Sequence, residues 1–132
     1  MRITGSCHCG QITYQAEVDA DGVRICHCTD CQQLCGSAFR AVIVAASDKF
    51  TLLTGQPKTY VKTADSGNRR SHAFCANCGS PIYACAIRDP QSYTLRGSIR
   101  ERAQLRPNKQ IWCRSALPWV TTLDAIEKFS QQ

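Results

Sequence analysis

An all-β fold is the class that this 132-residue sequence predicts, and three observations lead to it. Apolar residues recur mostly at every second position, which is the spacing of a strand with one buried face. Stretches rich in Gly, Pro, Asn and Asp separate these runs, as turns between strands do. Helical periodicity is hard to find. We therefore expect about eight or nine short strands, arranged as two sheets or a barrel in a single domain over residues 1–132.

The expected strands can be followed along the chain. The alternating apolar residues are Ile12, Tyr14, Ala16 and Val18, and then Phe50 and Leu52. The run AFRAVIVA (38–45) is typical of a more fully buried strand. Further strand candidates are PIYACAI (81–87), YTLRG (93–97) and IWCRS (111–115). The turns between them are expected at DADG (19–22), LTGQP (53–57), ADSGN (64–68) and RDPQS (88–92). Helix is expected only as a short turn after Cys28 and in the tail LDAIEKF (123–129).

Ten cysteines are far more than a chain of this size ordinarily carries. Such density is typical of a secreted disulfide scaffold or of a metal protein. The first residues, MRITGSCHCG, do not resemble a signal peptide, and the longest apolar run, 41–46, is too short to cross a bilayer. We therefore expect a cytoplasmic protein without membrane association. In that reducing setting, clustered thiols are metal ligands more often than disulfides.

The formal net charge is +6, from sixteen Lys and Arg against ten Asp and Glu. If seven of the ten cysteines bound two Zn²⁺ ions as thiolates, seven negative and four positive charges would be added, and the net charge would fall to +3. The basic residues are scattered and are not interleaved with aromatic residues, so the sequence disfavours nucleic-acid binding. A mildly basic surface suits a small anionic substrate equally well.

The motif CANCG, Cys75 to Gly79, has the spacing of a zinc knuckle. Two intervening residues let both sulfurs reach one ion, and Gly79 can adopt the positive φ that closes the turn. A tetrahedral site needs two more ligands. Cys7 and Cys9 in CHCG offer them, because residues two apart on a strand face the same side. We therefore expect a structural Zn(Cys)₄ site that joins the first strand to the middle of the chain; the alternative is that Cys7 and Cys9 are ordinary buried cysteines.

The motif CHCTDC offers three sulfurs, those of Cys26, Cys28 and Cys31. Cys35, His27 or His72 could complete a closed four-ligand site. If none of them does, the ion keeps an exchangeable position, as catalytic zinc does. The residues alone leave these two possibilities open.

The other histidines and cysteines have ordinary explanations. His8 and His27 each stand between two cysteines, so each is expected to point away from the metal. His72 is expected to be a strand residue with a solvent or backbone partner. We expect Cys85 to be a small core residue, and Cys113 to be either a core residue or a reactive thiol, with the core interpretation preferred.

Seven cysteines follow one another in the order CxC, CxCxxC, CxxCG. They stand among the segments GSCHCGQITY, CHCTDCQQLCGSAF, FTLLTG, FCANCGSPIY, LRGSI and SALPW. In these motifs the sequence resembles the glutathione-dependent formaldehyde-activating enzyme family, which includes the centromere protein V domain. The resemblance covers nearly the whole chain. It implies a β-tent of antiparallel sheets carrying two zinc ions. It also implies a structural zinc on Cys7, Cys9, Cys75 and Cys78, and a labile, catalytic zinc on Cys26, Cys28 and Cys31.

The activity implied by the resemblance is carbon–sulfur bond chemistry, in which glutathione and formaldehyde form S-(hydroxymethyl)glutathione. Three positions depart from the family pattern. An acidic residue often follows GS in the family, where this sequence reads GSIRER; Gln110 stands where histidine is common, and Cys35 replaces a small hydroxyl residue. The resemblance implies a zinc-dependent carbon–sulfur lyase that acts on thiol–aldehyde adducts and binds a small thiol such as glutathione.

Two other functions compete with this one. A non-catalytic zinc-binding interaction module would use the same scaffold. A methionine-R-sulfoxide reductase would use Cys113 as nucleophile, but it would leave CxCxxC without a role. The sequence indicates neither the oligomeric state nor the true thiol and aldehyde.

Overall fold

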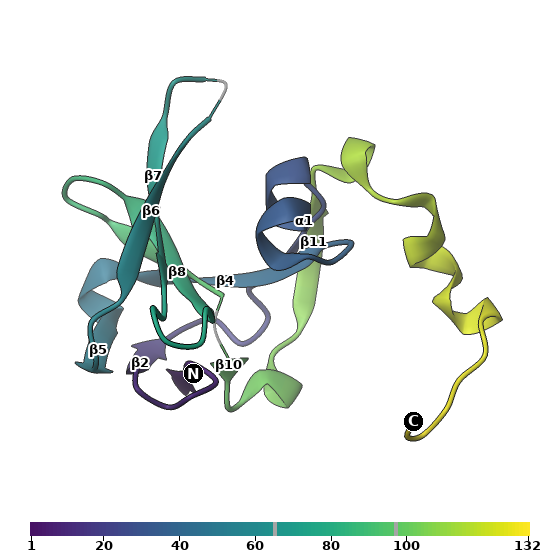
Figure 1. Ribbon diagram of the computed structural model, residues 1–132, viewed down its shortest axis with the longest axis horizontal. Coiled ribbons are helices and arrows are strands. Elements are labelled where there is room, and N and C mark those ends of the chain that lie inside the picture. Colours follow the sequence, from purple (N-terminus) through teal and green to yellow (C-terminus); the bar gives the residue numbers. More distant parts are fainter. Residues whose placement is uncertain (65, 97) are drawn as a thin grey trace.

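A computed structural model describes residues 1–64, 66–96 and 98–132. The described residues form eleven strands in two sheets, with one short α-helix and four 3₁₀ segments (Figure 1). The predicted all-β class is confirmed. The expected turn at 64–68 and the strand candidate at 93–97 include Asp65 and Gly97, which lie outside the described residues.

The smaller sheet has the strand order β10-β1-β2-β5 and is antiparallel throughout. Its strands are β1 (Arg2–Ser6), β2 (Thr13–Glu17), β5 (Phe50–Thr54) and β10 (Ser98–Ile99). β1 and β2 form a hairpin whose connecting loop contains Cys7 and Cys9. The alternation predicted for β2 is observed, since Tyr14 and Ala16 are buried while their neighbours are more exposed.

The larger sheet has the strand order β11-β3-β4-β9-β8-β7-β6. Its strands are β3 (Val23–Cys26), β4 (Arg40–Ala46), β6 (Lys58–Thr63), β7 (Arg69–Phe74), β8 (Pro81–Ala86), β9 (Ser92–Leu95) and β11 (Pro107–Ile111). Its pairs are antiparallel except β3–β11, which is parallel. β11 is therefore an edge strand of this sheet, and it lies beside β3, whose last residue is Cys26.

The core contains residues from both sheets. Ile3 and Tyr14 from the smaller sheet and Ile43, Ile82 and Leu95 from the larger one are at most 2% exposed. An aromatic group extends this core, because the Phe50 ring of β5 stacks on the Tyr93 ring of β9 with centroids 4.5 Å apart. The two sheets are therefore held to each other by apolar burial.

The helix α1 (Thr29–Cys35) follows β3 directly, as the expected turn after Cys28. It ends at Gly36, whose φ of 63° is the left-handed conformation that terminates helices. The remaining short helices are the 3₁₀ segments η1 (Ser47–Lys49), η2 (Arg102–Gln104), η3 (Cys113–Ser115) and η4 (Pro118–Ala125). Over the described residues, every helix is too short to span a membrane.

The strand expected over IWCRS is wrong beyond its first residue. β11 ends at Ile111, Trp112 has a φ of 58°, and η3 follows. The positive φ turns the chain away from the sheet, and the C-terminal segment then extends away from the two sheets (Figure 1). Several of its apolar side chains are exposed, namely Trp119, Leu123, Ile126 and Phe129.

Candidate metal centres

The thiols of Cys7, Cys9, Cys75 and Cys78 form one group, in which all four sulfurs lie within 4.8 Å of one another. The Sγ atoms of Cys7 and Cys9 are 3.5 Å apart, and those of Cys9 and Cys75 are 3.7 Å apart. Four sulfurs placed tetrahedrally about 2.3 Å from a zinc ion would be about 3.8 Å from one another. The group therefore has the dimensions of a Zn(Cys)₄ site.

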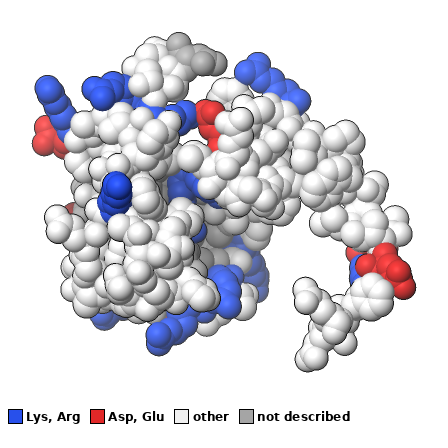
Figure 2. Space-filling model, in the orientation of Figure 1, with Lys and Arg blue, Asp and Glu red and all other residues white. Residues whose placement is uncertain are grey.

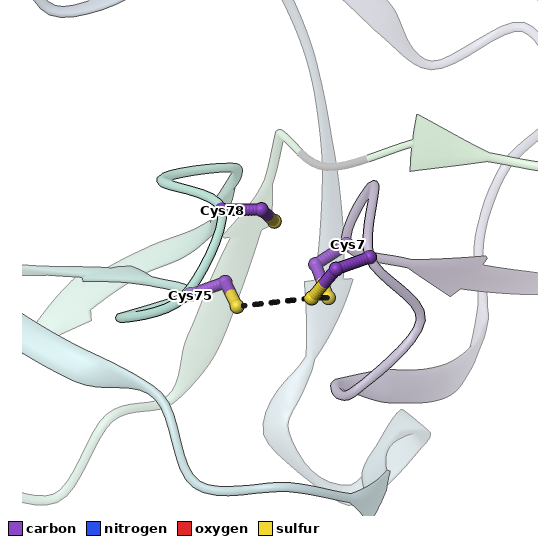
Figure 3. A group of neighbouring side chains, drawn as sticks. Cys7, Cys75 and Cys78 are labelled. Carbon is purple, nitrogen blue, oxygen red and sulfur yellow. Dashed lines mark hydrogen bonds between the residues drawn. The ribbon is translucent and has the colours of Figure 1, made fainter.

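Two similar turns position these thiols. After β1, the N–H of Gly10 donates to the Cys7 carbonyl at 3.1 Å, and after β7, the N–H of Gly79 donates to the Cys75 carbonyl at 2.8 Å. Both glycines have positive φ, 81° and 76°. Figure 3 shows Cys7 facing Cys75 and Cys78 from opposite loops. The resulting group connects the smaller sheet to the larger one.

Hydrogen bonds favour the thiolate form of Cys78 in the four-cysteine group. The N–H of Ile12 donates to the Cys7 sulfur at 3.2 Å, and the Ser80 hydroxyl lies 3.3 Å from the Cys78 sulfur. The Ser80 hydroxyl, followed by the backbone N–H groups of Cys9 and Ser80, lowers the pKa of Cys78 to about 5. Donors that stabilise a thiolate are what a zinc–cysteine site requires, so these residues fit a zinc ion.

The thiols of Cys26, Cys28 and Cys31 form a second group with the same 4.8 Å limit. Cys26 is the last residue of β3, Cys28 is the N-cap of α1, and Cys31 lies in the first turn of that helix. The N–H of Cys31 donates to the Cys28 sulfur at 3.3 Å. The strand-to-helix junction thus brings three thiols together within six residues.

Hydrogen bonds distinguish the members of the three-cysteine group, because burial acts to raise the pKa of every one of its thiols. Burial raises the pKa of Cys26 to about 12. Burial also acts to raise the pKa of Cys28, but the N–H of Cys31 and hydrogen bonds from the neighbouring thiols lower it overall. A divalent cation would compensate for the burial of three thiolates. Three soft donors fit a zinc ion, with the ligand number that catalytic zinc sites have.

The residues that sequence analysis considered as a fourth ligand lie outside this group, within the part of the chain that the structure describes. The Cys35 sulfur lies 3.5 Å from the Phe39 carbonyl oxygen. His27 is 1% exposed, and its Nε2 lies 2.7 Å from the Gln110 side-chain oxygen. His72 lies on β7, and burial followed by the charge of Arg96 lowers its pKa to about 4.

Two glutamines hold the loop that carries the three-cysteine group. Gln32 donates through its side-chain nitrogen to the carbonyls of His27, at 2.8 Å, and Ser115, at 2.9 Å. Gln110 of β11 lies beside His27, and the His27 N–H donates to the Ile111 carbonyl at 3.0 Å. In the sequence, Gln110 stands out only as a departure from the family pattern, and Gln32 does not stand out at all. Their roles depend on contacts between distant segments, which no local signal announces.

A cleft of about 420 Å³ opens beside the three-cysteine group, and Cys26 and Cys31 are on its wall. The same wall carries Arg70 and Arg96, and the Arg96 guanidinium lies 3.9 Å from the Cys31 sulfur. Figure 2 shows basic side chains scattered over one face, with some in the hollow between the part that carries β6–β8 and the part that carries α1. These arginines were not predicted from the sequence. The available signal was an arginine inside an apolar strand pattern, as in YTLRG.

The remaining cysteines and His8 are placed individually. Cys85 is buried, so the core interpretation is confirmed. Cys113 is exposed in η3, so the preferred core interpretation is wrong; the cause is the turn at Trp112, which takes this residue off the sheet. His8 is exposed, and its N–H donates to the Ser80 hydroxyl.

The protein has an all-β fold with two cysteine groups whose dimensions could hold metal ions. A family model described as glutathione-dependent formaldehyde-activating enzyme matches residues 2–115. The chain belongs to this family. The resemblance found in its motifs is thereby confirmed.

A solved structure supports the fold. A crystal structure of a Rhodobacter sphaeroides protein from a structural genomics programme is 19% identical in sequence, with a TM-score of 0.57. The match covers 79% of this chain and 97% of that one. At this identity the likeness shows a shared architecture alone.

Proposed function

We propose that this protein is a zinc-dependent enzyme acting on the carbon–sulfur bond of thiol–aldehyde adducts. The reaction we favour is the formation of S-(hydroxymethyl)glutathione from glutathione and formaldehyde, which corresponds to carbon–sulfur lyase chemistry in the reverse direction. Membership of the family supports this reaction. The observation that carries the proposal is the three-cysteine group on the wall of an open cleft, beside a guanidinium group.

The two cysteine groups would have different roles. Cys7, Cys9, Cys75 and Cys78 would hold a structural zinc ion between the two sheets, and Cys26, Cys28 and Cys31 would hold a catalytic one. When bound by the three-cysteine group, zinc would act as a Lewis acid that lowers the pKa of an incoming thiol. Three protein ligands are the number found in catalytic zinc sites, whereas structural sites are closed by four.

The chain's own residues would bind and orient the reactants. The cleft is large enough for a small thiol, since small-molecule pockets are typically about 300–1,000 Å³. A carbon–sulfur bond forms between the thiol sulfur and the aldehyde carbon, and the thiol proton passes through solvent to the carbonyl oxygen. Arg96, next to Cys31, would favour the anionic form of a sulfur that enters here. Holding both reactants in one cleft would supply most of the acceleration.

A metal-protection experiment tests this function. The zinc-loaded protein is treated with a mild chelator, and the released zinc is measured with and without millimolar glutathione. We expect one zinc equivalent to leave first and glutathione to slow its release. S-methylglutathione keeps the charges of glutathione but lacks its free thiol, so it should not protect. Absence of both binding and protection by glutathione would refute the glutathione assignment.

The exposed apolar side chains of the C-terminal segment favour the alternative, a non-catalytic zinc-binding interaction module. Trp119 is 52% exposed, Ile126 62% and Phe129 75%. Exposed apolar groups of this kind gather at protein contacts. If two zinc ions bind and neither exchanges a ligand with thiols, this alternative becomes the better one.

A further inference from the structure

Three arginines, Arg40, Arg70 and Arg96, lie around the three-cysteine group, and we call them the arginine cluster. Arg70 and Arg96 line the cleft beside Cys26 and Cys31, and Arg40 and Arg96 line a neighbouring cavity of about 350 Å³. Arg96 therefore borders both spaces. The cluster comes from three neighbouring parts of the larger sheet, β4, β7 and the end of β9.

None of the ion pairs among residues 1–64, 66–96 and 98–132 involves this cluster. The pairs found there are Lys49–Glu17, Lys62–Asp30 and Lys128–Asp124. Arg40 is nevertheless only 6% exposed. A buried guanidinium without a counter-charge is costly, and such groups are normally paired.

Polar atoms of the cluster also lack hydrogen-bond partners. The Nε atoms of Arg40 and Arg96 are buried without one. The Arg70 guanidinium is held in place by the Ala84 carbonyl at 3.2 Å and the Thr94 hydroxyl at 3.4 Å. Buried donors of this kind need an acceptor. Positively charged donors favour an anionic one.

The charges of the cluster act on one another. Arg96 borders both spaces, so its guanidinium faces the like charge of Arg70 in the cleft and that of Arg40 in the neighbouring cavity. Burial followed by the charges of Arg96 and Arg40 lowers the pKa of His72 to about 4, so this imidazole is neutral near pH 7. An anion entering the cleft would relieve the repulsion within the cluster.

We propose that the arginine cluster binds a carboxylate of the thiol substrate while the sulfur lies at the Cys26–Cys28–Cys31 end of the cleft. This inference rests on the proposed function and specifies its substrate class: thiols that carry a carboxylate. The Arg70 and Arg96 guanidinium groups bind the carboxylate oxygens, and Arg40 adds its charge from the neighbouring cavity.

Charge balance supports a ligand with two negative groups. A zinc ion with three thiolates has net charge −1, and the arginine cluster contributes three positive charges. A bound thiolate–carboxylate ligand would balance these charges, and Arg24, which is exposed on the wall of the same cleft, would remain as one further positive charge. A neutral thiol would leave the cluster uncompensated, and a cationic thiol would be repelled by it.

The test compares two thiols of nearly equal size, 3-mercaptopropionate and 3-mercaptopropionamide, on the zinc-loaded protein by titration calorimetry. We expect the carboxylate to bind at least about tenfold more tightly than the amide. In a cobalt-substituted sample, the sulfur-to-cobalt charge-transfer band should change at about tenfold lower concentration of the carboxylate, which confirms that the sulfur reaches the metal.

Arg70→Gln should remove most of this preference, and Arg70→Lys should keep part of it, because the charge is retained. Arg69→Gln is the matched control: it removes the same charge from the next residue of β7, which is exposed. It should leave the preference unchanged. Melting temperature and zinc content of each variant report its folding, and the ratio for the unaltered protein is informative even if Arg70→Gln fails to fold.

The outcomes separate the two proposals. If both thiols bind equally, or if the preference survives in a folded Arg70→Gln protein, the carboxylate assignment is wrong while the thiol chemistry stands. If neither thiol binds nor alters the cobalt band, both proposals are wrong. If the carboxylate is preferred and Arg70→Gln removes the preference, the carboxylate assignment is supported. Glutathione, which has two carboxylates, should then compete with 3-mercaptopropionate.

Discussion

The two cysteine groups contain similar residues but are built from very different lengths of chain. The four-cysteine group joins the β1–β2 loop to the β7–β8 loop, and Cys9 and Cys75 within it are 66 positions apart. The three-cysteine group lies within residues 26–31, at one strand end and the helix that follows. The first group connects two sheets, whereas the second occupies one local junction.

The two groups also differ in their surroundings: one lies in the hydrophobic core and the other beside an open cleft. Cys7 and Cys75 are each 1% exposed and belong to the hydrophobic core. Cys26 and Cys31 are buried too, but they line an open cleft. A group that joins distant segments can contribute its metal-binding free energy to folding, while a local group on a cleft can change its ligands with little effect on the fold. Connectivity thus supports the two proposed roles independently of the number of thiols in each group.

The largest effect is expected from Cys78→Ser. This change should remove the structural zinc and lower the unfolding free energy by several kcal/mol, a large part of the roughly 5–15 kcal/mol of a typical domain. Thermal melting and zinc analysis would measure it. Cys85→Ala is the control, since Cys85 is a buried thiol outside both groups, and it should keep both zinc equivalents. A normally melting Cys78→Ser protein with full zinc content would contradict the contrast between the two groups.

Cys28→Ala should separate metal loss from unfolding. Cys28 is half-buried, and its group is local, so we expect loss of one zinc equivalent and of thiol binding with a change in unfolding free energy of at most about 1–2 kcal/mol. Zinc analysis, glutathione titration and denaturant unfolding on one sample would test this. Unfolding as severe as that of Cys78→Ser would remove the distinction.

Gln32→Ala tests the support of the local group. Its side-chain nitrogen donates to two carbonyls, so the change should cost about 1–2 kcal/mol. It should also speed the release of zinc from the three-cysteine group to a chelator, while release from the four-cysteine group stays unchanged. Equal acceleration at both groups would indicate that Gln32 stabilises the whole fold instead.

The pH dependence of stability offers a smaller effect. The pKa of His72 is about 4 in the folded protein, below its ordinary value of 6.5, because of burial and then Arg96 and Arg40. The unfolded chain therefore binds more protons between these values, and the contribution of His72 to stability falls as the pH drops from 6.5 toward 4. His72 is partly exposed, so solvent screening limits the effect to at most about 1 kcal/mol between pH 7 and 5.5. Comparing unfolding of the wild type with His72→Gln at each pH cancels the contribution of the thiols. An equal pH response in both proteins would refute the shift.

Cys35→Ser should have the smallest effect. The Cys35 sulfur faces backbone carbonyls, 3.5 Å from that of Phe39, rather than the three-cysteine group. A serine hydroxyl can donate to the same carbonyls, so both zinc equivalents and thiol binding should be retained. Loss of one equivalent would mean that Cys35 closes the second site, and that the site is structural.

The sequence was most informative where the signal is local. Period-two alternation predicted β2, and the CxxC and CxCxxC spacings predicted thiols that the structure brings together. One failure is nevertheless local. The strand over 111–115 ends early because Trp112 adopts a positive φ, and no residue type announces this as a glycine would.

The surroundings of the three-cysteine group were equally beyond local patterns. Arg40, Arg70 and Arg96 are distant in sequence and meet only because β4, β7, β8 and β9 are neighbours in the larger sheet. Gln32 and Gln110 gain their partners through the parallel pairing of β11 with β3. Strand order decides these contacts, and strand order is not written in the periodicity of any single segment.

The parallel pair β3–β11 has a consequence for the order of assembly on the ribosome. Cys7, Cys9, Cys75 and Cys78 have all been synthesised before residues 107–111, so the four-cysteine group is complete while β3 still lacks its outer neighbour. Only when β11 is added does the Ile111 carbonyl accept the His27 N–H, and only then does Ile111 complete the wall of the cleft. Pairing across such a sequence separation is slow compared with local contacts. A nascent chain would thus complete the four-cysteine group before it completes the cleft beside the three-cysteine group.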